Sequence, residues 1–175
     1  MNSPLHPVAV RPLTRRALLV VPCLLWALAS AGCGEAQAAE PVPAEARIAL
    51  DKLEIMELAS RFENTFDRGD LQGHLDTWVD DLNFESPFGN YTTKAAYTQW
   101  VTAFSQNAQA SGGTRHLVTN FEITVTGDTA QMECYLTIFS RTSPKTIFTS
   151  AFVKDQLRKV DGRWKFVSRK LETDG

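Results

Sequence analysis

Cysteine, histidine and basic charge are all scarce in this chain of 175 residues. It has three cysteines, three histidines, and 18 Lys and Arg against 20 Asp and Glu, which gives a formal net charge of −2. Such a balance offers no basic surface to a phosphate backbone and argues against a nucleic-acid partner. No cluster of His, Cys, Asp and Glu has metal-ligand spacing, so we expect no metal and no other cofactor.

The few cysteines cannot form a disulfide framework. Cys23 lies in an apolar segment near the start, Cys33 follows it, and Cys134 is the only one in the rest of the chain. Cys134 alternates with Met132 and Leu136 in a strand-like segment. We therefore expect it to be a small buried hydrophobic side chain rather than a nucleophile.

The first 33 residues are typical of an export signal. Three arginines at positions 11 to 16 precede an apolar segment that runs from Ala17 to about Ala31. This segment is shorter than the roughly 20 residues that a transmembrane helix needs, and Pro22 interrupts it. Residues 1–33 are therefore interpreted as a signal peptide, and a permanent transmembrane helix is the weaker interpretation.

Two alternative cleavage sites follow this signal. The stretch "SAGC" resembles a bacterial lipobox, in which Cys33 would be lipidated and become the mature N-terminus. The stretch "AQA", which ends at Ala38, resembles a site whose cleavage would release a soluble protein. "TRRALL" also resembles a twin-arginine signal. Cleavage at either site predicts a location in the periplasm or cell envelope. The protein would contact the membrane only through a lipid anchor at Cys33, if the lipobox is the site used.

A folded domain is expected over residues 46–175, after a linker at 34–45. Apolar residues recur at helical spacing for about twenty residues from Ala46. Gly69 can cap the end of this helix, and Asp70 fits the N-cap of a second one. The second helix is predicted from apolar residues at positions i, i+3, i+4, i+7 and i+8: Leu71, His74, Leu75, Trp78 and Val79.

The second half of the domain changes to a period of two. A short strand at 82–86 and a third helix that begins at Thr92 or Thr93 precede this change. Turns at Gly127 and Gly162 suggest hairpins, which make neighbouring strands antiparallel. Helices followed by an antiparallel sheet predict an α+β fold. The four expected strands span 115–125, 129–139, 146–160 and 163–171.

Three stretches of this domain resemble the SnoaL-like branch of the nuclear transport factor 2-like superfamily: "FENTFDRGDLQGHLDTWVDDLNFESPFGNYTTKAA", "TRHLVTNFEITVTGDTAQMECYL" and "VKDQLRKVDGRWKFVSRK". The resemblance implies a cone-shaped α+β barrel, with three N-terminal helices packed on a curved antiparallel sheet around an apolar pocket. It also implies a homodimer formed through the outer face of the sheet. The superfamily includes dehydratases, dehydrochlorinases, steroid isomerases and epoxide hydrolases, so the resemblance fixes no single activity.

Some members carry an aspartate at the end of the first long helix and a histidine at the start of the first meander strand. Asp67 in "FDRGD" and His116 in "RHLVTN" match these positions. The resemblance implies a catalytic dyad in which the carboxylate orients the imidazole, which removes a proton from carbon. The second histidine of the dehydratase and the tyrosine of the steroid isomerase have no counterparts here. The two readings are therefore a cofactor-independent lyase or isomerase, and a non-catalytic ligand-binding or accessory envelope protein.

Both dyad candidates also have structural explanations. Asp67 stands close to Gly69, where a helix ends, and Asp is common in turns. Strict alternation along the strand places His116 on the more polar side, which leaves open whether His116 faces the pocket. The two alternating sets are Val118, Asn120, Glu122 and Thr124 with His116, and Leu117, Phe121, Ile123 and Val125 on the other face.

The pocket is expected to hold a hydrophobic small molecule, since the helices and loops that would surround it are rich in aromatic residues. Most of these side chains belong to the core. Asp155 and Arg169, on neighbouring strands of the last hairpin, are expected to form a structural ion pair. The expected pocket residues are Phe66, Phe84, Tyr91, Trp100 and Asn120.

Overall fold

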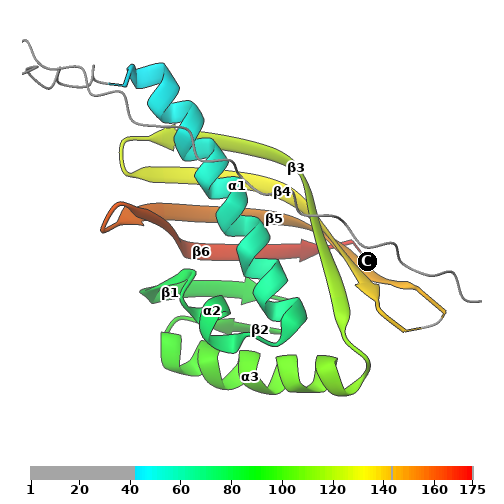
Figure 1. Cartoon of the computed structure of the whole chain (residues 1–175). Helices are drawn as coiled ribbons and strands as arrows, with labels where there is room; N and C mark the ends of the chain where they lie inside the picture. Colours follow the sequence, from blue (N-terminus) through cyan, green and yellow to red (C-terminus); the bar gives the residue numbers. More distant parts are fainter. Residues whose placement is uncertain (1–41, 143, 175) are drawn as a thin grey trace, which may run out of the picture. The chain divides into compact units, whose positions relative to one another are not determined.

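The computed structural model describes residues 42–142 and 144–174 (Figure 1). The expected signal peptide, both cleavage sites, Cys33 and most of the linker lie outside these residues. In the described part of the chain, no helix is both long and apolar enough to cross a membrane.

One six-stranded sheet organises the domain, with strand order β2-β1-β6-β5-β4-β3. The long helix α1 crosses one face of this sheet, and α3 lies beside β1 and β2 (Figure 1). This arrangement is α+β, as the sequence predicted. The elements are α1 (Ala44–Arg68), α2 (Leu71–Leu75), β1 (Trp78–Ser86), β2 (Gly89–Tyr91), α3 (Lys94–Ala110), β3 (Thr114–Thr126), β4 (Thr129–Ser140), β5 (Ile147–Val160) and β6 (Arg163–Thr173).

Helix α1 forms because one of its faces is largely apolar. That face is buried against the sheet and includes Ile55, Leu58 and Phe62. The helix ends where Gly69 adopts a left-handed conformation with φ 72°, and its N–H bonds back to the carbonyls of Phe66 and Thr65. The predicted glycine cap is therefore present, and it holds the last turn of α1 at the edge of the core.

The second helix is much shorter than predicted. It ends at Leu75, and Trp78 and Val79 belong to strand β1 instead. Both residues are buried, so the apolar pattern correctly marked core positions but not their backbone conformation. Trp78 instead pairs with Phe166 on β6, and this pairing favours an extended backbone over a helical one. Two strands, β1 and β2, precede α3, where the sequence predicted a single short strand at residues 82–86.

The four-stranded meander β3–β6 is antiparallel, as predicted. The whole sheet is mixed, however, because β1 pairs with β6 in parallel. Strand β1 does not follow β6 through a hairpin but reaches it from the N-terminal half of the chain, so no tight turn dictates its direction. This pairing adds β1 and β2 to the far edge of the meander.

A bulge in β3 settles which face His116 occupies. The register with β4 shifts between Thr119 and Glu122, and Asn120 has φ 58°. Because one extra residue reverses the alternation, His116 and Val118 lie on the same face as the apolar residues after the bulge. That face packs against the core through Val118, Phe121, Ile123 and Val125. Strict alternation across the whole segment was therefore the wrong pattern.

A buried ion cluster joins α1 to the sheet. Arg169 on β6 donates through Nε and Nη2 to the two carboxylate oxygens of Asp155, at 2.8 and 2.9 Å. This is the predicted ion pair. Nη1 also donates to Glu63 of α1 at 2.9 Å, a contact the sequence did not reveal. The guanidinium carbon lies 4.2 Å from the ring centre of Phe62 and 4.7 Å from that of Phe166.

Removal of one member of this cluster should destabilise the fold strongly. Asp155→Ala leaves a buried guanidinium without its bidentate partner and should lower the free energy of unfolding by about 3–5 kcal/mol. Arg158→Ala is the matched control, since it breaks an ion pair with the exposed Asp81 and should change stability little. Urea denaturation measures both variants. Equal effects of the two substitutions would contradict a structural role for the cluster.

Candidate functional site

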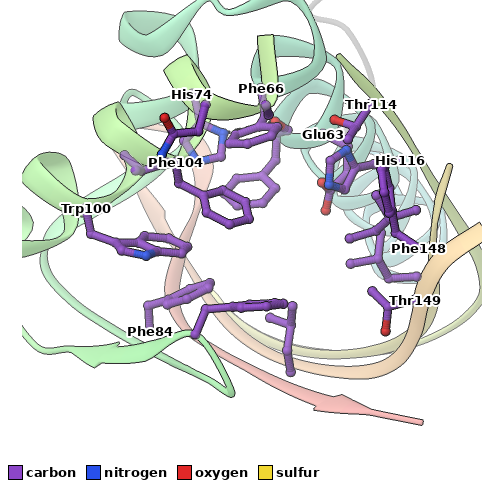
Figure 2. A pocket seen from close by; sticks show the side chains of 18 of the residues that line it. Glu63, Phe66, His74, Phe84, Trp100, Phe104, Thr114, His116, Phe148 and Thr149 are labelled. Atoms are coloured by element: carbon purple, nitrogen blue, oxygen red, sulfur yellow. Dashed lines mark hydrogen bonds between the residues drawn. The ribbon is translucent and has the colours of Figure 1, made fainter. Parts of the chain in front are cut away.

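A cavity of about 510 Å³ lies between the helices and the sheet. Figure 2 shows Trp100, Phe104 and Phe84 on one side of it, and His116, Glu63 and Thr114 on the opposite side. The volume falls within the usual range of small-molecule sites. The aromatic wall consists of Phe62, Phe66, Phe84, Phe88, Trp100 and Phe104.

Asp67 and His116 meet at the polar side of this cavity. Their side chains are joined through Oδ1 of Asp67 and Nδ1 of His116 at 2.7 Å. The backbone N–H of His116 donates to Oδ2 of Asp67 at 2.9 Å, and the Thr114 hydroxyl donates to Oδ1 at 3.2 Å. The carboxylate can only accept, so Nδ1 carries the proton and Nε2 presents a lone pair. No hydrogen bond to Nε2 exists among residues 42–142 and 144–174.

Local backbone features bring the two residues together. Asp67 is in the last turn of α1, just before the Gly69 cap. Gln109, near the end of α3, donates to the carbonyl oxygens of Phe66 and Asp67 at 3.4 and 3.3 Å. The chain then turns into β3 through Gly112 and Gly113, with φ of 94° and 83°. The ends of both helices and the start of β3 are thereby held around one carboxylate.

The surroundings of His116 change its basicity. Burial lowers the pKa of its imidazole, whereas the hydrogen bond to Asp67 and the negative charge of Glu63 raise it. The two raising effects together outweigh burial, so the pKa of His116 lies above its ordinary value. The edge of Phe66 packs against the imidazole, with ring centres 5.2 Å apart. His116 is therefore a strengthened base held in a fixed orientation.

A second imidazole in the cavity wall was not identified from the sequence as a site residue. His74 of α2 donates from Nδ1 to the carbonyl of Phe62 at 3.1 Å and accepts at Nε2 from the Tyr97 hydroxyl at 2.7 Å. Burial lowers the pKa of His74 to about 4, so the ring is neutral near pH 7. The sequence pattern placed His74 on an apolar helix face, which is correct but conceals its hydrogen bonds.

The expected pocket residues divide into two groups. Phe66, Phe84 and Trp100 line the cavity. Tyr91 does not, because its ring stacks on Trp100 with centres 5.0 Å apart and forms part of the adjacent core. Asn120 does not line it either, because the β3 bulge leaves this residue exposed.

Glu63 and Arg169 line the cavity but were not expected there. Glu63 occupies the same face of α1 as Phe62 and Phe66, and an acidic residue within an otherwise apolar helix face is the signal that could have identified it.

In the described part of the chain, no group of three or more His, Cys, Asp and Glu could hold a metal ion. Cys134 is buried, and burial raises the pKa of its thiol to about 12, so it is no nucleophile.

Residues 47–170 match the model of a protein family described as the SnoaL-like domain. A protein of unknown function with a cystatin-like fold from Nostoc punctiforme is 38% identical, with a TM-score of 0.65, over 72% of this chain and 92% of that one. A comparison with curated proteins found no match.

More distant solved structures share the fold. A proposed scytalone dehydratase from Novosphingobium aromaticivorans is 21% identical, with a TM-score of 0.67, over 75% of this chain and 89% of that one. LinA is 17% identical, with a TM-score of 0.65, over 75% of this chain and 90% of that one. At these identities the likeness concerns the fold alone.

The pKa values of the two described histidines should be shifted in opposite directions from the ordinary value. In a histidine NMR titration, we expect His116 to have a pKa above 6.5 and His74 one near 4. Asp67→Asn should lower the pKa of His116, because the carboxylate that stabilises the imidazolium is lost, and should leave His74 nearly unchanged. A pKa of His116 below 6.5 in the unaltered protein would show that burial outweighs Asp67.

Proposed function

Because the chain belongs to the SnoaL-like domain family, we propose that its cavity binds a small, largely apolar molecule and that His116 removes a proton from one of its carbon atoms. The protein would then be a cofactor-independent lyase or isomerase. The observation that carries this proposal is the 2.7 Å hydrogen bond between Asp67 and Nδ1 of His116, which leaves Nε2 available as a base.

In the proposed reaction, Nε2 of His116 takes the proton and the electron pair of the C–H bond stays with the substrate. Asp67 stabilises the imidazolium that forms, and the charge of Glu63 acts in the same direction. If the electron pair expels a leaving group from the neighbouring carbon, the reaction is an elimination. If His116 returns the proton to another carbon, the reaction is an isomerisation. The aromatic wall would hold the substrate and keep water away.

The name of one structural neighbour agrees with this class of chemistry. It is a proposed scytalone dehydratase, and the family-level resemblance described above associates an aspartate and a histidine with such enzymes. The fold supports the proposal only by analogy, since one fold hosts many reactions. The geometry of Asp67 and His116 supports it independently.

A neutral ring compound that reacts by base-induced loss of a carbon-bound proton tests this base directly. We expect the protein to accelerate ring opening of 5-nitrobenzisoxazole, in which removal of the proton on carbon breaks the N–O bond and releases a coloured phenolate. His116→Gln should lower kcat/KM by about 10²-fold or more, because it removes the base. Asp67→Asn should lower it at least about tenfold, because Nδ1 loses the acceptor that fixes the reactive tautomer.

The pH profile separates a base from a residue that only packs. The rate should rise with pH through the raised pKa of His116, because only the neutral imidazole accepts a proton. Asn120→Ala is the matched control, since Asn120 is exposed outside the cavity on the same strand. An unchanged rate in His116→Gln, or a rate without this pH dependence, would contradict the proposal.

A non-catalytic binding protein remains the second candidate. It is favoured by Arg169, whose guanidinium bonds to Asp155 and Glu63, so among the described residues that line the cavity no unpaired Lys or Arg faces a developing negative charge. A ligand screen by thermal shift distinguishes the two candidates. A ligand that stabilises the protein and His116→Ala equally, without being consumed, would favour simple binding.

We also propose that the protein is exported and anchored at the cell envelope through Cys33. The "SAGC" stretch after the apolar segment supports this location. In a bacterial host, labelled palmitate should be incorporated into the full-length protein but not into Cys33→Ser. A soluble periplasmic product that begins after Ala38 would instead favour the alternative cleavage site.

A further inference from the structure

With His116 neutral, the side chains of the cavity interior offer unused hydrogen-bond acceptors, whereas most of their donors already bond to the protein. From this imbalance we infer that the site, with His116 neutral, selects uncharged ring compounds that carry a hydrogen-bond donor and discriminates against carboxylates. The inference specifies the ligand class of the proposed function and rests on the same cavity. It does not depend on whether His116 performs chemistry.

The buried and half-buried hydroxyl groups of the cavity wall already donate to the protein. Thr114 donates to Asp67 at 3.2 Å, and Thr149 donates to the carbonyl of Ser150 at 3.2 Å. Tyr97 lies 2.7 Å from Nε2 of His74. Nδ1 of His74 faces a carbonyl, which can only accept, so Nδ1 carries the proton and Tyr97 must be the donor. Its hydroxyl proton is therefore also in use.

The charge of Arg169 is already balanced by two carboxylates. Three of its five N–H groups bond to Asp155 and Glu63, and its side chain is only 1% exposed. Phe62 and Phe166 lie against it. A ligand carboxylate could reach this cation only by displacing one of its buried partners, which would leave a buried charge unpaired.

The spare acceptors lie on the same side of the cavity. Nε2 of His116 has a lone pair, and Oε2 of Glu63 accepts no hydrogen bond from any described residue. A ligand O–H or N–H can satisfy these acceptors, whereas a carboxylate cannot.

Charge acts in the same direction. Three carboxylates, those of Asp67, Glu63 and Asp155, are buried here with one buried guanidinium, that of Arg169, and the half-exposed guanidinium of Arg115 lies 3.9 Å from Asp67. With His116 neutral, this region has an excess of negative charge, which adds electrostatic repulsion to the cost of removing an anion from water. The lining residues with unused side-chain donors, Asn107 and Ser111, are exposed to solvent, where water competes for them.

Three indoles separate these effects, because they share one ring system. Indole carries an N–H, 1-methylindole lacks it, and indole-3-carboxylate adds a negative charge. We would measure their dissociation constants on the full-length protein by calorimetry, at a pH above the pKa of His116 found in its NMR titration, so that its imidazole is neutral. Methylation should weaken binding about fivefold, the worth of roughly one hydrogen bond. The carboxylate should bind at least about tenfold more weakly than indole.

Glu63→Gln provides the matched variant. It removes one negative charge, introduces an N–H donor and nearly preserves the shape of the side chain. It should therefore strengthen binding of indole-3-carboxylate relative to the unaltered protein. Its affinity for 1-methylindole should stay the same, which also shows that the cavity remains folded.

The outcomes are distinguishable. Equal affinity for indole and its carboxylate would overturn the charge selection, and equal affinity for indole and 1-methylindole would overturn the need for a donor. Either result would leave the proposed proton abstraction by His116 intact if 5-nitrobenzisoxazole still reacts. Failure of all three compounds to bind would contradict both the selection and an apolar ligand site.

Discussion

The buried contact of Arg169 with Asp155 and Glu63 determines much of the domain's character. It joins α1 to β5 and β6, and so fixes the helix that carries Asp67 relative to the sheet that carries His116. It also leaves net negative charge beside the cavity, which raises the pKa of His116 through Glu63. A purely apolar contact could hold the helix equally well, but it would not place negative charge beside the cavity.

The hydrogen bonds of Asp67 fix the orientation of the His116 imidazole. One carboxylate accepts from the Thr114 hydroxyl and from both the backbone and the ring of His116. Together these bonds fix the position of the strand and the tautomer of the imidazole. The aromatic residues on the opposite wall, including Phe84 and Trp100, then define where an apolar molecule would lie. The structure thus combines an oriented imidazole with an apolar cavity wall.

Local sequence patterns predicted the fold well where residues close in sequence determine an element. The apolar face of α1, the Gly69 cap and the antiparallel meander all follow from spacing and turn residues. Prediction failed at Trp78 and Val79, because burial alone does not distinguish a helix from a strand that gains its partner elsewhere in the chain. The contacts of Glu63 and His74 depend on residues distant in sequence, and a periodic pattern carries no such information.

The bulge at Asn120 has a different consequence, which concerns how the strand could change. Residues before and after it are in opposite phase, so His116 and the apolar half of β3 face inward together only because one extra residue separates them. Side-chain replacements at the bulge would leave this phase intact. Loss or gain of a single residue there would turn either the histidine or the hydrophobic half outward. The inward placement of His116 therefore tolerates substitutions at the bulge more readily than insertions or deletions.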